Sequence, residues 1–180
     1  MKEQNVKLWN FQGDLLATLE GHSAIVLDVE FNSDSSKIAT ASADNTVKIW
    51  NINHDKSLAT LEGHSDSVLG VKFQPYSQKI ASASVDKTIK LWQWDGNEAK
   101  LERTLIGHLA AVQSLDFSSD GQTLTSGSND RTVILWTKQS LLESEDLMFD
   151  GCNWIRNYLS YNHAVAESDR QLCDGVMSNK

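Results

Sequence analysis

The chain of 180 residues contains little proline, few cysteines and no long hydrophobic run. One proline and ten glycines are too few for a low-complexity chain, and a hydrophobic content of 40% is ordinary for a globular protein. No apolar stretch approaches the roughly 20 residues that a membrane-spanning helix needs. The N-terminal segment, MKEQNVKLWNFQG, also lacks the apolar core of a signal peptide. We therefore expect a globular protein that does not insert into a membrane.

Both cysteines, Cys152 and Cys173, lie near the C-terminus. Neither has a second Cys or a His at zinc-finger spacing, which favours reduced thiols and a cytoplasmic location; a single disulfide between them is the alternative. Basic residues are also scarce, since 16 Lys and Arg against 24 Asp and Glu give a formal net charge of −8. The lysines are dispersed and form no basic cluster, which argues against binding to nucleic acid.

An internal repeat is the strongest pattern in the sequence. The octapeptide LATLEGHS occupies residues 16–23 and again residues 58–65, and a third, diverged copy, RTLIGHL, occupies residues 103–109. A tryptophan follows each Gly-His pair, always 28 residues after the histidine, and the pairs are 42 and then 44 residues apart. A repeat of this length is typical of a four-stranded propeller blade.

Each repeat has the pattern of short strands joined by turns. The histidine is followed by an apolar-rich stretch that ends in phenylalanine (VLDVEF, VLGVKF or VQSLDF), and then by a turn rich in Ser, Asp and Gly. A strand of small residues comes next (IATAS, IASAS or LTSGS), and an Asp-x-Thr turn leads into VKIW, IKLW or VILW. A fourth strand, such as SLATL or KLERTL, precedes the next Gly-His pair. The pattern predicts an all-β fold.

The Gly-His pair, the Asp-x-Thr turn and the tryptophan together closely resemble the WD-repeat family over residues 5–137. The dipeptide that ends the third strand has drifted to Trp-Asn, Trp-Gln or Trp-Thr, a place where family members commonly vary. The resemblance implies a β-propeller domain at residues 1–137, with three nearly complete blades, one half blade and an incomplete ring. The repeat then stops, and residues 138–180 are expected to form a short α-helical tail.

Three histidines and three aspartates at equivalent places in the repeats could suggest a metal site or a catalytic relay. Each aspartate, however, stands six residues before its tryptophan and four residues after a Ser or Thr. In the family these four residue types form one hydrogen-bonded chain within each blade, which satisfies polar groups that are costly to bury unpaired. The resemblance therefore implies structural tetrads, with no catalytic residue, metal ion or cofactor. The tetrads are Trp50–Thr40–His22–Asp44, Trp92–Ser82–His64–Asp86 and Trp136–Ser126–His108–Asp130.

Propellers usually bind partners on the face that carries the loops before the first strand and between the second and third strands. We call this the loop face. By resemblance, three positions in each blade point there: three and five residues after the histidine, and one before the aspartate. The four large aliphatic residues among them would form an apolar patch for a partner, or would instead pack inward against neighbouring loops. The nine positions are Ile25, Leu27, Ala43, Ser67, Leu69, Val85, Ala111, Gln113 and Asn129.

Both ends of the repeat region are incomplete. Residues 5–19 supply only a third and a fourth strand, with Glu3 where the aspartate should stand, and no fourth strand is recognisable after Trp136. Unpaired strand edges and an open blade face favour association with other strands. We interpret the chain as the C-terminal piece of a longer propeller protein, in preference to a ring completed by a second copy. Expressed alone, it is expected to self-associate through its open edges.

The tail contains two helix-capping patterns and an apolar stripe that includes Trp154 and Tyr158. Its sequence resembles the closing segment of bacterial multidomain WD-repeat proteins. We expect the tail to pack an apolar face on the propeller. Two alternatives are a partner-binding helix and a zinc site built from Cys152, Cys173 and His163, for which only three ligands are in view.

No nucleophile motif, phosphate-binding glycine loop or zinc-protease motif occurs in the sequence, so an enzyme is not expected. We predict a cytoplasmic interaction scaffold that binds a protein or peptide through the loop face. It would be the sensor or docking end of a larger bacterial signalling protein. The alternative is the regulatory part of a signal-transduction NTPase whose catalytic domain lies upstream.

Overall fold

The computed structural model describes residues 4–52 and 57–137. Every regular element in these residues is a β-strand, so the predicted all-β class is confirmed. The expected helical tail, with Cys152, Cys173 and His163, lies outside the described residues, as does Glu3. The strands are β1 (Val6–Trp9), β2 (Leu15–Leu19), β3 (Val26–Phe31), β4 (Lys37–Ser42), β5 (Val47–Asn51), β6 (Ser57–Leu61), β7 (Val68–Phe73), β8 (Lys79–Ser84), β9 (Thr88–Trp94), β10 (Ala99–Ile106), β11 (Val112–Phe117), β12 (Thr123–Ser128) and β13 (Val133–Thr137).

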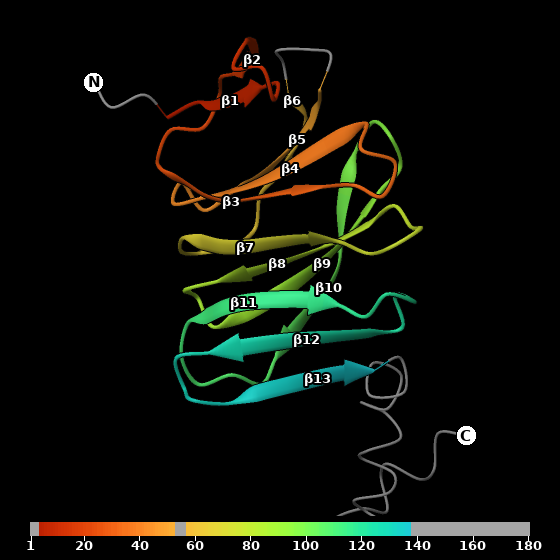
Figure 1. Cartoon of the computed structure of the whole chain (residues 1–180). Coiled ribbons are helices and arrows are strands. Elements are labelled where there is room, and N and C mark those ends of the chain that lie inside the picture. Colours follow the sequence, from red (N-terminus) through yellow and green to blue (C-terminus); the bar gives the residue numbers. More distant parts are fainter. Residues whose placement is uncertain (1–3, 53–56, 138–180) are drawn as a thin grey trace, which may run out of the picture. The chain divides into compact units, whose positions relative to one another are not determined.

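The strands form four sheets in which neighbouring strands are consecutive in the chain. β1 and β2 form an N-terminal hairpin, β3–β6 the first blade, β7–β10 the second blade and β11–β13 the third blade. In the described residues the first two blades have four strands, the third has three and the hairpin has two, as the repeat predicts. The first strands of the three blades, β3, β7 and β11, lie side by side in that order (Figure 1).

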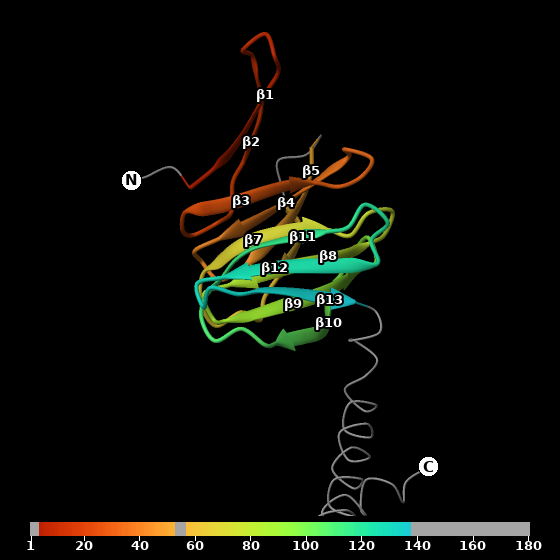
Figure 2. The ribbon, with the colours of Figure 1, turned by 60° about the horizontal axis from the view of Figure 1, so that its bottom comes forward.

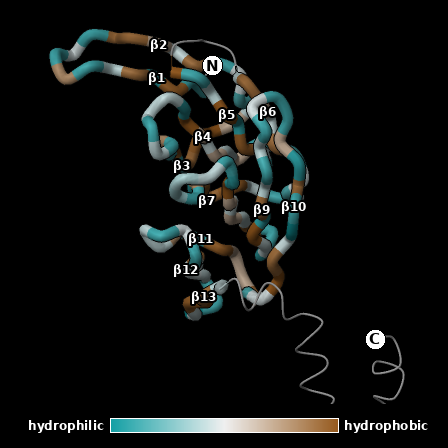
Figure 3. Tube along the Cα trace, turned by 90° about the vertical axis from the view of Figure 1, so that its right-hand side faces the viewer, coloured by the Kyte–Doolittle hydropathy of each residue, from teal (hydrophilic) through white to brown (hydrophobic). Residues whose placement is uncertain are grey.

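The small-residue strands are the most deeply buried part of the fold. In β4 and β8 every residue after the initial lysine is buried, with no alternation between an inner and an outer face. A strand covered on both faces needs apolar or small side chains throughout, and Ala and Ser let the neighbouring sheet approach closely. Hydrophobic residues recur along the strands in Figure 3, while the turns between them are mostly hydrophilic. The core therefore lies between successive blades.

Equivalent residues of the first and second blades differ in burial because their neighbours differ. Val71 and Phe73 on β7 are 0% and 8% exposed, since β7 packs on β3 and β4 of the first blade. Val29 and Phe31, which stand 42 residues earlier on β3, are 47% and 51% exposed. The N-terminal hairpin packs through Leu19 on another part of the first blade and projects away from it (Figure 2). One face of β3 is therefore open.

Polar bonds join the first and second blades along β3 and β7. The Asp28 carboxylate accepts the backbone N–H of Val71 at 3.0 Å through Oδ2, and its Oδ1 accepts the N–H of Val29 at 2.9 Å. Lys72 of β7 also forms an ion pair with Glu30 of β3. Because β7 is the edge strand of its sheet, the N–H of buried Val71 depends on a partner in the neighbouring blade.

We predict that Asp28→Ala lowers the free energy of unfolding by about 1–3 kcal/mol, because it leaves the N–H of Val71 buried without an acceptor. Urea denaturation measures the change. Asp66→Ala is the matched control, since Asp66 accepts only the N–H of the next residue through its side chain. Equal losses of stability in the two variants would contradict the role of Asp28 between the blades.

Candidate functional site

The loop face of each blade consists of two loops that are joined through the backbone. One loop precedes the first strand of the blade, and the other connects the second strand to the third. In every blade a single N–H···O bond links the first and the third of the three predicted binding positions. The bonds run from Ala43 N to Ile25 O (2.9 Å), from Val85 N to Ser67 O (3.0 Å) and from Asn129 N to Ala111 O (3.0 Å).

None of the nine predicted binding positions is buried in this chain. Ile25 and Leu27 are 58% and 44% exposed, which makes them the most open aliphatic residues of the set, and Leu69 and Val85 are half-buried. Of the five remaining positions, two are exposed and three are half-buried: Gln113 and Asn129 are exposed, and Ala43, Ser67 and Ala111 are half-buried.

A hollow of about 510 Å³ adjoins the loop face of the first blade. Its wall contains Ile25 and Ala43, two of the predicted binding positions, together with Ser23 of the same loop. Gln4 and Asn5, which precede β1, complete the polar part of the wall. The hollow thus combines an exposed aliphatic side chain with amide and hydroxyl groups that can form hydrogen bonds.

Beneath the loops of the first blade lies a continuous hydrogen-bonded relay. The indole Nε1 of Trp50 donates to Thr40 Oγ1 at 2.8 Å, and His22 Nε2 lies 2.7 Å from the same oxygen. On the other side of the ring, His22 Nδ1 lies 2.7 Å from Asp44 Oδ2. Trp50 and Thr40 are fully buried and His22 is nearly so. The four residues form one chain of contacts from the interior to the loop face.

The second blade repeats this geometry closely. Trp92 Nε1 donates to Ser82 Oγ at 2.8 Å, and His64 lies 2.8 Å from Ser82 and 2.7 Å from Asp86. A serine hydroxyl therefore takes the place of the threonine, and the His-to-hydroxyl distance is 2.8 Å instead of 2.7 Å. The Gly63 that precedes the histidine has a φ of 154°, and a Cβ there would lie 3.2 Å from the Trp92 indole.

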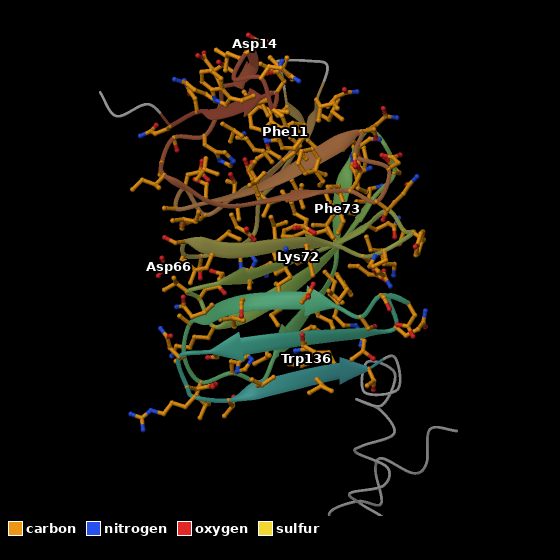
Figure 4. The ribbon with its side chains drawn as sticks, viewed as in Figure 1. Phe11, Asp14, Asp66, Lys72, Phe73 and Trp136 are labelled. Carbon is orange, nitrogen blue, oxygen red and sulfur yellow. The ribbon has the colours of Figure 1, made fainter. Side chains whose placement is uncertain are left out.

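The third blade contains the same histidine geometry. His108 Nε2 lies 2.8 Å from Ser126 Oγ, and His108 Nδ1 lies 2.9 Å from Asp130 Oδ2. Trp136 lies on β13 (Figure 4), and its participation in the tetrad stays a prediction.

The direction of the protons in the relay follows from the donors available. Trp50 Nε1 can only donate, so Thr40 Oγ1 accepts from it and keeps its own hydrogen for another acceptor. A neutral His22 with its proton on Nδ1 donates to Asp44 and accepts the Thr40 hydroxyl hydrogen at Nε2. With a charged imidazolium, His22 Nε2–H and Trp50 Nε1–H would both donate to Thr40 Oγ1, and the Thr40 hydroxyl hydrogen would have only Lys48 O, at 3.4 Å, as an acceptor. The geometry therefore favours the neutral Nδ1–H form, which gives the Thr40 hydroxyl an acceptor at 2.7 Å.

Each aspartate connects the relay to both loops. Asp44 Oδ2 also accepts the N–H of Ser23 at 2.9 Å, and Asp44 Oδ1 accepts the hydroxyl of Thr46 at 2.6 Å. The sequence interpretation missed this hydroxyl as a member of the relay, although the Asp-x-Thr turn in every repeat was a signal for it. Equivalent bonds reach Asp86 from Ser65 N and Thr88, and Asp130 from Leu109 N and Thr132.

Burial and hydrogen bonding shift the pKa values within the relays. Burial is the main cause that lowers the pKa of His22 and His64, and it outweighs the opposing effect of the neighbouring carboxylates. For Asp44, burial raises the pKa, but bonds from Thr46, His22 and Ser23 outweigh burial and lower it to about 2. For Asp86 burial also raises the pKa, but bonds from Thr88 and His64 outweigh burial and lower the pKa to about 2. The relays are therefore adapted to a neutral imidazole beside a charged carboxylate.

The described residues contain no group of three His, Cys, Asp or Glu side chains that could hold a metal ion. The histidine of each blade lies within hydrogen-bond distance of the Ser or Thr and the Asp of the same blade. Over residues 4–52 and 57–137, no helix is long and apolar enough to cross a membrane.

Comparisons with known proteins match the three repeats. The profile of the family described as "WD domain, G-beta repeat" matches residues 13–51, 55–93 and 99–137. The chain is 44% identical over 52 residues to a bromodomain and WD repeat-containing protein of Dictyostelium discoideum. This match covers 28% of this chain and 2% of that protein. It is 38% identical over 58 residues to eukaryotic translation initiation factor 3 subunit I of Pyricularia oryzae, and this match covers 32% of this chain and 17% of that protein. It is 55% identical over 38 residues to pre-mRNA-processing factor 19 homolog 2 of Arabidopsis thaliana, and this match covers 21% of this chain and 7% of that protein. The matches thus span only a small part of each relative.

We predict that Thr40→Val leaves two buried groups, the Trp50 N–H and His22 Nε2, without a hydrogen-bond partner. Each loss should lower the free energy of unfolding by on the order of 1–3 kcal/mol. The two side chains have the same shape, so the loss measured by denaturant unfolding reports on the hydroxyl. Thr40→Ser should retain most of the stability, because Ser82 serves the same role in the second blade. A Thr40→Val protein as stable as Thr40→Ser would contradict the relay.

We also predict that the protein loses stability on acidification in two stages. His22 and His64 have lowered pKa values in the folded state, so their contribution is complete above the ordinary value of 6.5 and is lost as the pH falls below it. Asp44 and Asp86 contribute above their ordinary value of 3.8, and this contribution is lost as the pH falls towards about 2. Urea midpoints between about pH 8 and 2 measure both stages. His22→Gln with His64→Gln should flatten the upper stage, whereas stability that rises on acidification would refute the interpretation.

Proposed function

Because the chain belongs to the WD-repeat family, we propose that its loop face binds a protein or peptide partner. Members of this family generally act as non-catalytic protein-interaction scaffolds. The observation that supports the proposal most directly is the pairing of exposed side chains with rigid loops. Ile25 and Leu27 are open to solvent, while the loop that carries Ile25 is held by Asp44 and by the bond from Ala43. A partner would find these side chains already positioned.

Preorganised loops matter because binding has to offset the entropy lost when flexible segments become ordered. In each blade the aspartate of the relay accepts bonds from both loops, so the loops cannot separate without exposing a buried histidine. The hollow beside Ile25 adds a concave element with amide and hydroxyl groups at its wall. Together these features suit a partner with an apolar side chain flanked by backbone hydrogen-bonding groups.

The wider context is also part of the proposal. The chain covers 2% to 17% of the three relatives described above, one of which is by name a subunit of a translation initiation factor. We propose that the chain is a docking or sensor part of a larger cytoplasmic protein. A bacterial signalling protein, with or without an upstream NTPase domain, is suggested only by the sequence resemblance of residues 138–180, whereas the named relatives are eukaryotic.

We predict that Leu27→Asp combined with Leu69→Asp lowers the affinity for the partner by tenfold or more, which corresponds to about 1.4 kcal/mol of binding free energy. The reason is that each change places a charge in a contact from which water is excluded. Partners captured by the unchanged protein are identified by mass spectrometry, and their binding to both proteins is then quantified. The melting temperature should be unchanged. The matched control is Leu16→Asp with Leu101→Asp, two leucines exposed on other strands. Equal binding by both double variants would contradict a site on the loop face.

A further inference from the structure

A second cavity, of about 450 Å³, lies between the first and second blades at the end opposite the loop face. Its wall includes Asn32 and Lys37 of the first blade, and Phe73, Tyr76 and Trp94 of the second. Figure 4 labels Asp66, next to the loop face, at one end of β7 and Phe73 at the other end. The cavity is therefore separate from the nine positions discussed above.

The internal repeat explains why this cavity exists between these two blades. Between the second and third blades, the side chain of Gln74 crosses the boundary and donates to Gly121 O at 2.6 Å. The residue equivalent to Gln74 in the first blade is Asn32, which is one methylene shorter. Its Oδ1 accepts the backbone N–H of Lys37 at 2.9 Å, so the side chain stays within its own turn. Here the first boundary is crossed by the bond from Tyr76 N to Ser33 Oγ at 3.2 Å, and no amide side chain fills the space that Gln74 fills at the second boundary.

The wall of the cavity contains an indole nitrogen without a partner. Trp94 is 5% exposed, and its Nε1 is the one buried side-chain nitrogen or oxygen in the described residues that forms no hydrogen bond. An indole N–H can only donate, and a buried donor without an acceptor costs about 1–3 kcal/mol. Trp94 is also outside the repeat, since the equivalent residue of the first blade is Ile52. The tetrads therefore do not account for it.

A cation lies directly beside this indole. Lys37 Nζ is 5.3 Å from the centre of the Trp94 ring and donates only to the hydroxyl of Ser36. Its equivalent in the second blade, Lys79, instead forms an ion pair with Glu102 at 2.6 Å. Asp34, at the exposed rim of the cavity, accepts the N–H of Ser36; bonds from Ser36 are the main cause that lowers the Asp34 pKa, and the nearby Lys37 charge contributes without a direct ion pair. Lys37 thus retains donor capacity next to the unpaired indole.

We propose that this cavity is a second binding site, which takes an acidic side chain of a protein partner. A carboxylate has two oxygens, one for the Lys37 ammonium and one for the Trp94 N–H, and charge-assisted bonds of this kind are the stronger ones. The methylene groups of a glutamate would pack on Phe73 and Tyr76. The indole nitrogen is not exposed to solvent, so the carboxylate reaches it once the Lys37 side chain, which lies over the ring, shifts aside and bonds to the second carboxylate oxygen. The site is independent of the loop face.

The experiment titrates the ¹⁵N-labelled chain with N-acetyl-glutamate amide and, separately, with N-acetyl-glutamine amide, up to about 50 mM because a single side chain binds weakly. The readout is the indole N–H resonance of Trp94, assigned by its loss in Trp94→Phe or, if that variant does not fold, by its contact with Phe73. We expect the glutamate probe to shift this resonance downfield towards a hydrogen-bonded position. The glutamine probe should produce a much smaller shift.

Variants distinguish the site from a general salt effect. Lys37→Met keeps the aliphatic stem and removes the charge, and it should weaken binding of the glutamate probe by about tenfold. Lys79→Met is the matched control, because it changes the equivalent lysine of the next blade, and it should bind as the unchanged chain does. Leu27→Asp should also have no effect, which separates this site from the loop face. Equal shifts with both probes, no shift at about 50 mM, or an unaffected Lys37→Met would each overturn the proposal.

Discussion

The structure depends on a buried relay in which an indole, a hydroxyl and an imidazole satisfy one another's hydrogen bonds. Each of these groups would destabilise the fold if it were buried alone, so none can be removed without orphaning the next. The relay also crosses the blade, from the tryptophan of the third strand to the aspartate in the loop before it. One set of bonds therefore stabilises the interior and positions the surface. This coupling is why a scaffold residue such as Asp44 also shapes a binding face.

The repeats differ in the contacts that join neighbouring blades. Within the blades the first two relays are almost superposable in their distances, whereas the contacts between blades are not repeated. The first boundary uses Asp28 and the pair of Lys72 with Glu30, and the second uses Gln74 and Gly121. At the place of Gln74 the first boundary has Asn32, which is one methylene shorter, and a cavity lies there. Variation at such positions can add binding sites without disturbing the blades.

Much of the fold was predictable because the repeat recurs with the same residue types at the same spacing. A constant spacing of 28 residues from histidine to tryptophan indicates equivalent strands, and turn residues mark their ends. The incomplete blades could also be inferred, since β1 and β2 have no preceding Gly-His pair. The contacts between blades could not be predicted, because they join residues that lie 42 or more apart and have no shared pattern. Lys87 and Arg131, with a φ of 72°, also adopt a backbone that their residue types do not signal. Trp94 carries no signal in the sequence, because it stands outside the repeated positions.

The central claim is that the buried His22 and His64 are neutral, each with its proton on Nδ1 directed at the aspartate. Imidazole ¹⁵N chemical shifts of His22 and His64 at neutral pH test it directly, because they distinguish the two neutral tautomers from the imidazolium. The account predicts a protonated Nδ1 and an unprotonated Nε2 in both residues. Two protonated nitrogens, or a proton on Nε2, would contradict it.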